Sequence, residues 1–198
     1  FPGLVHGVST RLGGEPPYFN NLSRHVGDDI ETVMKNRARF CAELGIDIAR
    51  FAHANQVHSA NASVITAPGL YSKCDALITC EENLYLVISV ADCLPVMLYD
   101  NNKKVIANIH SGWRGTVQGI TSAAIGKMSS EFGSKPDDIS AFIGPGITAE
   151  NFEVDEDVAE MFDVKYVKRK NPVKYLVDIK QCVLDQLMGS GVLTENIE

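Results

Sequence analysis

The sequence predicts a single α+β domain in which helices and sheets are stacked in layers. Three observations support this prediction: a length of 198 residues, an ordinary globular composition, and short apolar runs that alternate with helical segments. A chain of this length can bury one substantial core but is short for two. Runs of strands interrupted by helices are typical of layered α+β folds. We therefore expect one domain over residues 1–198.

Capping residues place the predicted helices. Apolar residues at helical spacing predict a helix that begins after Asp28 or Asp29 and ends at Gly45, a glycine suited to a left-handed C-cap. A second helix is expected over 116–131, closed by Gly133 and Pro136. Two more are expected near 155–162 and near 178–188, with Asp155 and Asp178 as their N-caps.

The remaining apolar runs predict short strands separated by turns. They are expected over residues 1–10, around Val57, and at Val64–Ile65, Ala76–Thr79, Leu84–Val90, Val96–Tyr99, Val105–Ile109 and Ser140–Ile143. The segment from Asp100 to Lys103 predicts a hairpin turn between two of them. No repeat, low-complexity tract or linker divides the chain.

Charge and cysteine content exclude several classes of protein. The net charge is −7, from 18 basic and 25 acidic residues, and there is no basic block, so neither nucleic acid nor an anionic membrane is expected as a partner. No apolar run approaches the ~20 residues of a membrane helix, and no secretory signal is visible. The five cysteines are scattered, which is typical of a reduced, cytoplasmic protein. They are Cys41, Cys74, Cys80, Cys93 and Cys182.

Two histidines and a cysteine lie where apolar runs give way to loops. His110 ends one run, Cys93 follows another, and His58 belongs to Gln56-Val57-His58. Thiolate and imidazole are zinc ligands, and three protein ligands leave a fourth position open for water or substrate, which favours an enzyme. The separations of 35 and 17 residues match no zinc finger. Taken singly, Cys93 is better explained by packing, and neither histidine points to a site, because a hydrogen bond to a backbone carbonyl would explain it.

Four other positions are weaker candidates. Arg11 and Arg114 both lie beside glycines, where backbone and guanidinium can bind an anion together, although solvated arginines in ordinary turns fit the same pattern. Trp113 could stack on a base, but packing between helix and sheet is its commoner use. His25 precedes the first helix and is a weak site candidate.

Several motifs together resemble one family. In chain order they are Ser9-Thr10-Arg11-x-Gly13-Gly14, His25-Val26-Gly27-Asp28-Asp29, Asn36-Arg37, Gln56-Val57-His58, Asp75-Ala76-Leu77-Ile78-Thr79, Ala91-Asp92-Cys93-x-Pro95, His110-x-Gly112-Trp113-Arg114-Gly115 and Ile143-Gly144-Pro145-Gly146-Ile147. They are similar to those of the laccase-domain family, also called the multicopper polyphenol oxidase or peptidoglycan editing factor family. The resemblance runs from Val5 to about Val154, and the Cys93 and His110 motifs are its most specific part.

The resemblance implies a single α-β-β-α layered sandwich with mixed sheets and a zinc ion held at His58, Cys93 and His110. It also implies phosphorolysis of adenosine, inosine and 5′-methylthioadenosine, and hydrolytic deamination of adenosine. The expected partners are therefore purine nucleosides and phosphate. We expect three catalytic residues: Cys93 on the metal, Arg11 on phosphate, and Asp92 as an acid or base.

Alternatives remain open at this stage. Cys93 and His110 could form a metal-free nucleophilic dyad that acts as an amidase on peptidoglycan precursors. A copper-dependent phenol oxidase is less favoured, because three ligands are too few for several copper centres and no His-x-His pair is present. A zinc-stabilised binding module without activity is the non-enzyme alternative.

The chain departs from the family pattern at two points. Family members usually carry a cysteine near the step that corresponds here to Phe152-Glu153-Val154, and they continue past residue 198 into a further tail.

Overall fold

The computed structural model describes residues 3–14, 16–23 and 26–198, and its contacts divide the chain into two compact units. The first unit covers residues 1–51 and the second covers residues 52–198. Each unit is described below by itself. His25, one of the weak site candidates, lies outside the described residues.

The N-terminal unit contains one long helix, α1 (Ile30–Leu44), followed by a 3-10 turn, η1 (Ile48–Arg50). The Asp29 side chain accepts a hydrogen bond from the Thr32 amide at the start of α1, and Gly45 ends the helix with φ 66°. The predicted helix is confirmed at both ends. The strand predicted over residues 1–10 is wrong for residues 3–10, which form no strand. Their side chains are mostly exposed, and alternating apolar residues make a strand only where a neighbour pairs with them.

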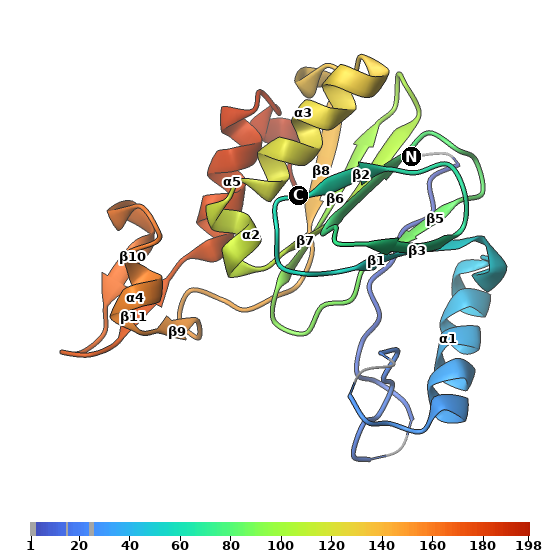
Figure 1. The fold of residues 1–198 in the computed structure, drawn as a ribbon, viewed down its shortest axis with the longest axis horizontal. Helices are drawn as coiled ribbons and strands as arrows, with labels where there is room; N and C mark the ends of the chain where they lie inside the picture. Colours follow the sequence, from blue (N-terminus) through green and yellow to red (C-terminus); the bar gives the residue numbers. More distant parts are fainter. Residues whose placement is uncertain (1–2, 15, 24–25) are drawn as a thin grey trace. The chain divides into compact units, whose positions relative to one another are not determined.

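The second unit is built around a five-stranded mixed sheet with the order β2-β4-β7-β6-β8 (Figure 1). Its strands are β2 (Ala62–Val64), β4 (Ala76–Thr79), β6 (Leu94–Asp100), β7 (Val105–Ser111) and β8 (Ile139–Ile143). β2 runs parallel to β4, and the other neighbouring pairs are antiparallel. The predicted hairpin is the β6–β7 connection, which brings the beginning of β6 beside the end of β7.

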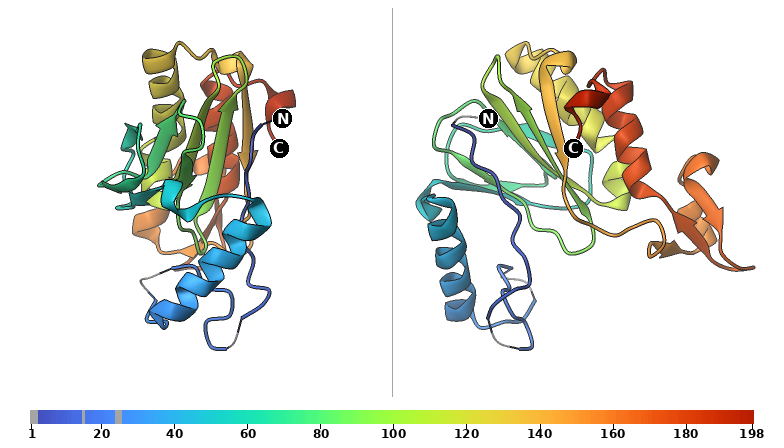
Figure 2. Two further views of the ribbon diagram at one scale, coloured as in Figure 1. Left: turned by 90° about the vertical axis from the view of Figure 1, so that its right-hand side faces the viewer. Right: turned by 180° about the vertical axis from the view of Figure 1, so that it is seen from behind.

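Helices α3 (Ile120–Phe132) and α5 (Ile179–Gly189) lie side by side against one face of this sheet (Figures 1 and 2). Between them and the sheet is the main apolar core, which includes Ile109, Ile125 and Leu187. The helix predicted over 116–131 is two helices, because a short α2 (Trp113–Val117) precedes α3. Gly119, at φ 80°, separates them with a backbone conformation that an α-helix cannot contain.

A second sheet, with the order β3-β1-β5, lies against the other face. Its strands are β1 (Phe51–Asn55), β3 (Gly69–Ser72) and β5 (Tyr85–Val87). Leu77 of β4 packs with Ala52 and Leu84 in a smaller core between the sheets, and Asn108 of β7 donates a hydrogen bond to the Leu86 carbonyl. The second unit is thus layered helix, sheet, sheet, and the predicted mixed α and β class with mixed sheets is confirmed.

The other elements of this unit form a small lobe and the connections around β8. The lobe contains β9 (Glu153–Val154), α4 (Glu156–Ala159), η3 (Val164–Tyr166), β10 (Val167–Arg169) and β11 (Tyr175–Val177), and the connections are η2 (Pro136–Asp138) and η4 (Thr194–Asn196). The helix predicted near 155–162 is therefore only the short α4, whereas the one near 178–188 is α5, capped by Asp178 as predicted. None of the helices in the described part of the chain combines the length and apolarity needed to cross a membrane.

Candidate metal centre

His58, Cys93 and His110 come together at one end of the five-stranded sheet. His110 is the penultimate residue of β7, and Cys93 directly precedes β6, whose first residue pairs with the last residue of β7. His58 lies in the loop after β1, not in a strand around Val57 as predicted. The ligand atoms of the three residues all lie within 4.8 Å of one another. The two imidazole rings meet edge to face, with centroids 4.8 Å apart.

The fully buried carboxylate of Asp75 contacts both histidines. Asp75 directly precedes β4, and the β4–β7 register places it beside His110. His110 Nδ1 lies 2.8 Å from Asp75 Oδ1, and the amide of His110 donates to the Asp75 carbonyl at 2.7 Å. The same carboxylate accepts hydrogen bonds from the amides of Val57, His58 and Ser59 and from the Ser59 hydroxyl. Asp75 was part of a motif in the sequence, but no role could be assigned to it there.

These contacts determine the charge of the buried pair. Burial opposes ionisation of Asp75, but the hydrogen bonds from Ser59, His110 and Val57 hold the pKa of its carboxyl below the ordinary value. Burial lowers the pKa of His110, which is 3% exposed, and the neighbouring His58 lowers it further, against the opposing effect of Asp75. The site near neutral pH is therefore an ionised aspartate next to a neutral imidazole, and a neutral imidazole is the form that binds a metal.

Gly112 leaves the space in which the three ligands converge. A Cβ at this position would lie 2.9 Å from His58 Cδ2, 3.1 Å from Cys93 Sγ and 3.3 Å from His110 Cε1. Its backbone, at φ −76° and ψ 163°, is open to any residue, so the need for glycine is one of space. Thr116 holds this residue in place, because both its amide and its hydroxyl donate to the Gly112 carbonyl.

The loop after β8 braces the backbone that carries Cys93. The Ile147 amide donates to the Asp92 carbonyl at 2.7 Å, and the Gly144 amide donates to the Pro95 carbonyl at 2.8 Å. A Cβ on Gly146 would lie 2.6 Å from Leu94 Cδ2, so the loop can approach this closely only with glycine there. The Gly-Pro-Gly turn of the sequence thus fixes the position of the thiol.

The thiol of Cys93 is not activated by its surroundings. Burial raises its pKa, and the negative charges of Asp92 and Asp75 raise it further. In the described part of the chain it has no hydrogen bond to either imidazole. A cysteine nucleophile reacts as the thiolate, and burial together with the two aspartates disfavours the thiolate of Cys93.

The residues present fit one transition-metal ion. Tetrahedral zinc with two nitrogen ligands and one sulfur ligand requires separations of roughly 3.3–3.6 Å between ligand atoms. The three ligand atoms lie within 4.8 Å of one another, so they would move closer together around a bound ion. Since Asp75 occupies Nδ1 of His110, Nε2 is the ring nitrogen left for a metal. In the described residues this is the one group of three or more metal-ligating side chains of this kind.

The other predicted residues lie in different settings. Asp92 is exposed and adjoins Cys93 in the bend before β6. Arg114 is exposed and lies over the ring of Trp113 at 4.2 Å, and Trp113 packs against the core, its commoner use. Arg11 belongs to the N-terminal unit, where its guanidinium lies over the Phe19 ring at 4.9 Å.

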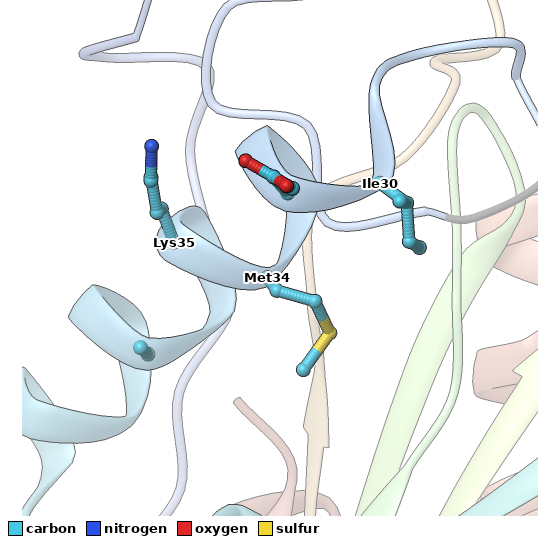
Figure 3. A pocket seen from close by; sticks show the side chains of 5 residues that line it. Ile30, Met34 and Lys35 are labelled. Atoms are coloured by element: carbon cyan, nitrogen blue, oxygen red, sulfur yellow. The ribbon is translucent and has the colours of Figure 1, made fainter.

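A shallow depression along α1 lies within the N-terminal unit. It is lined by Ile30, Glu31, Met34, Lys35 and Ala38. In Figure 3, Lys35 points away from Met34. This surface offers none of the chemistry found at the His58, Cys93 and His110 group.

Comparison with known proteins identifies the family of the chain. The sequence matches the family described as multi-copper polyphenol oxidoreductase laccase over residues 5–198. The chain belongs to this family. The match extends beyond Val154, where the recognisable motifs of the sequence end.

Named relatives extend the comparison. A purine nucleoside phosphorylase of Deinococcus radiodurans is 40% identical over 161 residues, which cover 80% of this chain and 63% of that protein. Adenosine deaminase RL5, from an unknown prokaryotic organism, is 30% identical over 89% of this chain and 74% of its own length. The matched region thus spans less than two thirds of the first relative. The expectation of an enzyme agrees with these names.

The fold is shared with a solved structure. The hypothetical protein YfiH of Bacillus licheniformis superposes with a TM-score of 0.89 at 28% identity, covering 95% of this chain and 78% of that one.

Proposed function

We propose that the chain is a zinc-dependent enzyme of purine nucleosides. It would carry out phosphorolysis of adenosine, inosine and 5′-methylthioadenosine, and hydrolytic deamination of adenosine. The single observation that carries the proposal is the convergence of His58, Cys93 and His110 around the space left by Gly112. The names of the relatives supply the substrate class.

The donor set supports zinc. Thiolate together with imidazole suits zinc and cuprous copper, while oxidation of phenols by several copper centres needs more ligands than the one group in the described residues. When bound, zinc supplies Lewis acidity and lowers the pKa of a coordinated water toward about 7. His58, Cys93 and His110 hold the ion in this proposal and leave one position open to substrate.

The remaining roles are assigned to Arg11 and Asp92. In phosphorolysis a phosphate oxygen bonds to C1′ of the ribose while the bond to the purine nitrogen breaks, and Arg11 would bind that phosphate through its guanidinium. In deamination water replaces the amino group at C6 and ammonia leaves. Asp92, exposed beside Cys93, would accept or return the proton in these steps.

Surroundings of the thiol favour this proposal over a Cys93–His110 hydrolase. The pKa of Cys93 is raised, and in the described residues its thiol makes no hydrogen bond to either imidazole. A thiol in this state becomes a good ligand once a metal displaces its proton, but it is a weak nucleophile without one.

The test follows adenosine turnover with and without phosphate, in wild type and in Cys93→Ala, with zinc measured in each preparation. Cys182→Ala is the matched control, because Cys182 is a free, buried cysteine in α5 that packs in the lobe core. We expect wild type and Cys182→Ala to contain zinc and to turn over adenosine, and Cys93→Ala to lose both. Adenine formed only with phosphate identifies phosphorolysis, and inosine identifies deamination.

Two other results would replace the proposal. A metal-free wild type whose turnover is abolished by a thiol alkylator, and protected by substrate, would establish the cysteine hydrolase. Phenol oxidation that depends on copper, without nucleoside turnover, would establish the oxidase.

A further inference from the structure

One oxygen of Asp75 contacts both candidate histidine ligands, and the other binds the backbone on either side of His58. Oδ1 lies 2.8 Å from Nδ1 of His110 and accepts from the amide of His58 at 2.9 Å. Oδ2 accepts from the amides of Val57 and Ser59 and from the Ser59 hydroxyl. The carboxylate is fully buried, and the three amides and the Ser59 hydroxyl donate to it. One side chain therefore contacts the ring of one candidate ligand and the backbone of the other.

For His110 the consequence concerns which ring nitrogen carries the proton. An ionised carboxylate only accepts hydrogen bonds, so Nδ1 carries the hydrogen and Nε2 is left with a free lone pair. Without this partner a neutral imidazole can carry its proton on either nitrogen, and protonated Nε2 cannot bind a metal. Burial of His110 at 3% exposure leaves little room for the ring to turn to another acceptor.

For His58 the consequence concerns the backbone. The residue has φ 60°, in the left-handed region that is unfavourable for residues other than glycine. Three successive amides, of residues 57 to 59, point at one carboxylate, an arrangement in which backbone dipoles bind an anion. These bonds hold a strained turn whose effect is to bring the exposed His58 side chain to the other two ligands.

We propose that Asp75 is the positioning residue of the metal centre, holding His110 in the Nδ1-protonated tautomer and His58 in its left-handed turn. This inference rests on the metal site of the proposed function. Asp75 itself touches no metal in this account. Its role is to fix the tautomer of His110 and the backbone of His58 before a metal binds.

The substitution Asp75→Asn tests this role because an amide cannot replace the carboxylate in either orientation. If the amide oxygen faces His110, the NH2 group meets the backbone amides of Val57 and Ser59, which are also donors. If the amide is flipped, the NH2 group meets Nδ1 of His110 and the backbone amide of His58. Shape and volume are almost unchanged, so the variant removes acceptors and charge without leaving a cavity.

Asp100→Asn is the matched control. Asp100 is also fully buried, lies in the same sheet, and accepts two backbone hydrogen bonds, from Asn102 and Lys103. It is the last residue of β6, and Cys93 directly precedes the first. Both substitutions thus replace a buried carboxyl group that accepts backbone hydrogen bonds, but of the two only Asp75 contacts the histidines.

The experiment measures the zinc dissociation constant by competition with a chromogenic chelator, using zinc alone as the probe. In metal-free protein, ¹⁵N shifts report the His110 tautomer and hydrogen exchange reports the amides of residues 57–59. We expect Asp75→Asn to weaken zinc binding about 10–100-fold. It should also lose either the Nδ1–H tautomer or the protection of these amides. Asp100→Asn should match wild type in all three measurements.

Three results would overturn the inference: wild-type zinc affinity in Asp75→Asn, equal weakening in Asp100→Asn, or a wild-type His110 protonated at Nε2. The last is measured on the unsubstituted, metal-free protein, so it decides the question even if Asp75→Asn does not fold. It also separates the two proposals. A wild type that binds no zinc refutes the zinc enzyme, whereas the tautomer still tests what Asp75 does to His110.

Discussion

Filling the space at Gly112 is the perturbation that most sharply separates metal binding from folding. In Gly112→Ala the new methyl group would lie 2.9–3.3 Å from atoms of His58, Cys93 and His110. The backbone angles suit alanine, so the substitution adds no backbone strain. In the metal-free protein the exposed His58 can move aside. With a metal bound, all three ligands are fixed and cannot yield.

The expected magnitude follows from overpacking. Forcing an extra methyl group into a packed site costs about 1–3 kcal/mol. Because this cost falls on the metal-bound state, and about 1.4 kcal/mol corresponds to a factor of ten, zinc binding should weaken roughly 5–150-fold. Stability of the metal-free protein should be unchanged or slightly higher, since alanine restricts the unfolded chain more than glycine does.

The assay is chelator competition for zinc, with thermal unfolding of the metal-free protein measured in parallel. Gly126→Ala is the control, since a Cβ at this position in α3 meets nothing within 4 Å. It should leave zinc affinity unchanged and stabilise the helix by about 0.5–1 kcal/mol. Wild-type zinc affinity in Gly112→Ala would refute the reasoning, because the three ligands could then not converge on this space.

Three further predictions concern protons and phosphate. Burial lowers the pKa of His110 in the folded chain below 6.5, so the unfolded chain binds this proton first as pH falls. The urea concentration at the unfolding midpoint of the metal-free protein should therefore decrease between pH 7 and pH 5. The decrease should be smaller in His110→Gln. An equal decrease of the midpoint in wild type and His110→Gln would contradict this role of His110. Because the pKa of Cys93 is raised, zinc must displace a thiol proton, so affinity should increase with pH from 6.5 to 8; pH-independent binding would argue against the thiol as ligand. Arg11→Ala should raise the KM for phosphate at least about tenfold, the loss of one charge-assisted contact, and leave zinc content unchanged; an unaltered KM would remove Arg11 from the phosphate site.

The helices and the central hairpin could be predicted because local residues determine them. Asp29 and Gly45 cap α1 through contacts within a few residues, and the turn after Asp100 joins two strongly apolar strands. The division of the helix at Gly119 was not predicted, because a single glycine inside a helical pattern is usually tolerated. Strands β3, β9, β10 and β11 were missed because each is two to four residues long and depends on its partners rather than its own pattern.

The candidate site was predicted in part. Family motifs pointed to His58, Cys93 and His110, and the structure brings their ligand atoms together, but their spacing alone permitted the group without indicating it. Asp75 was not assigned a role, because an aspartate before a short strand ordinarily caps a turn. Its importance comes from register: the antiparallel pairing of β4 and β7 places it beside His110, and no local pattern encodes that contact.

X-ray absorption at the zinc edge of the wild-type protein tests the central claim most directly, because it counts the ligands of the ion by element. The account predicts one sulfur at about 2.3 Å and two imidazole nitrogens at about 2.0–2.1 Å, with a further light atom completing four ligands. A zinc ion with no sulfur neighbour, or with two or more, would contradict a centre formed by His58, Cys93 and His110.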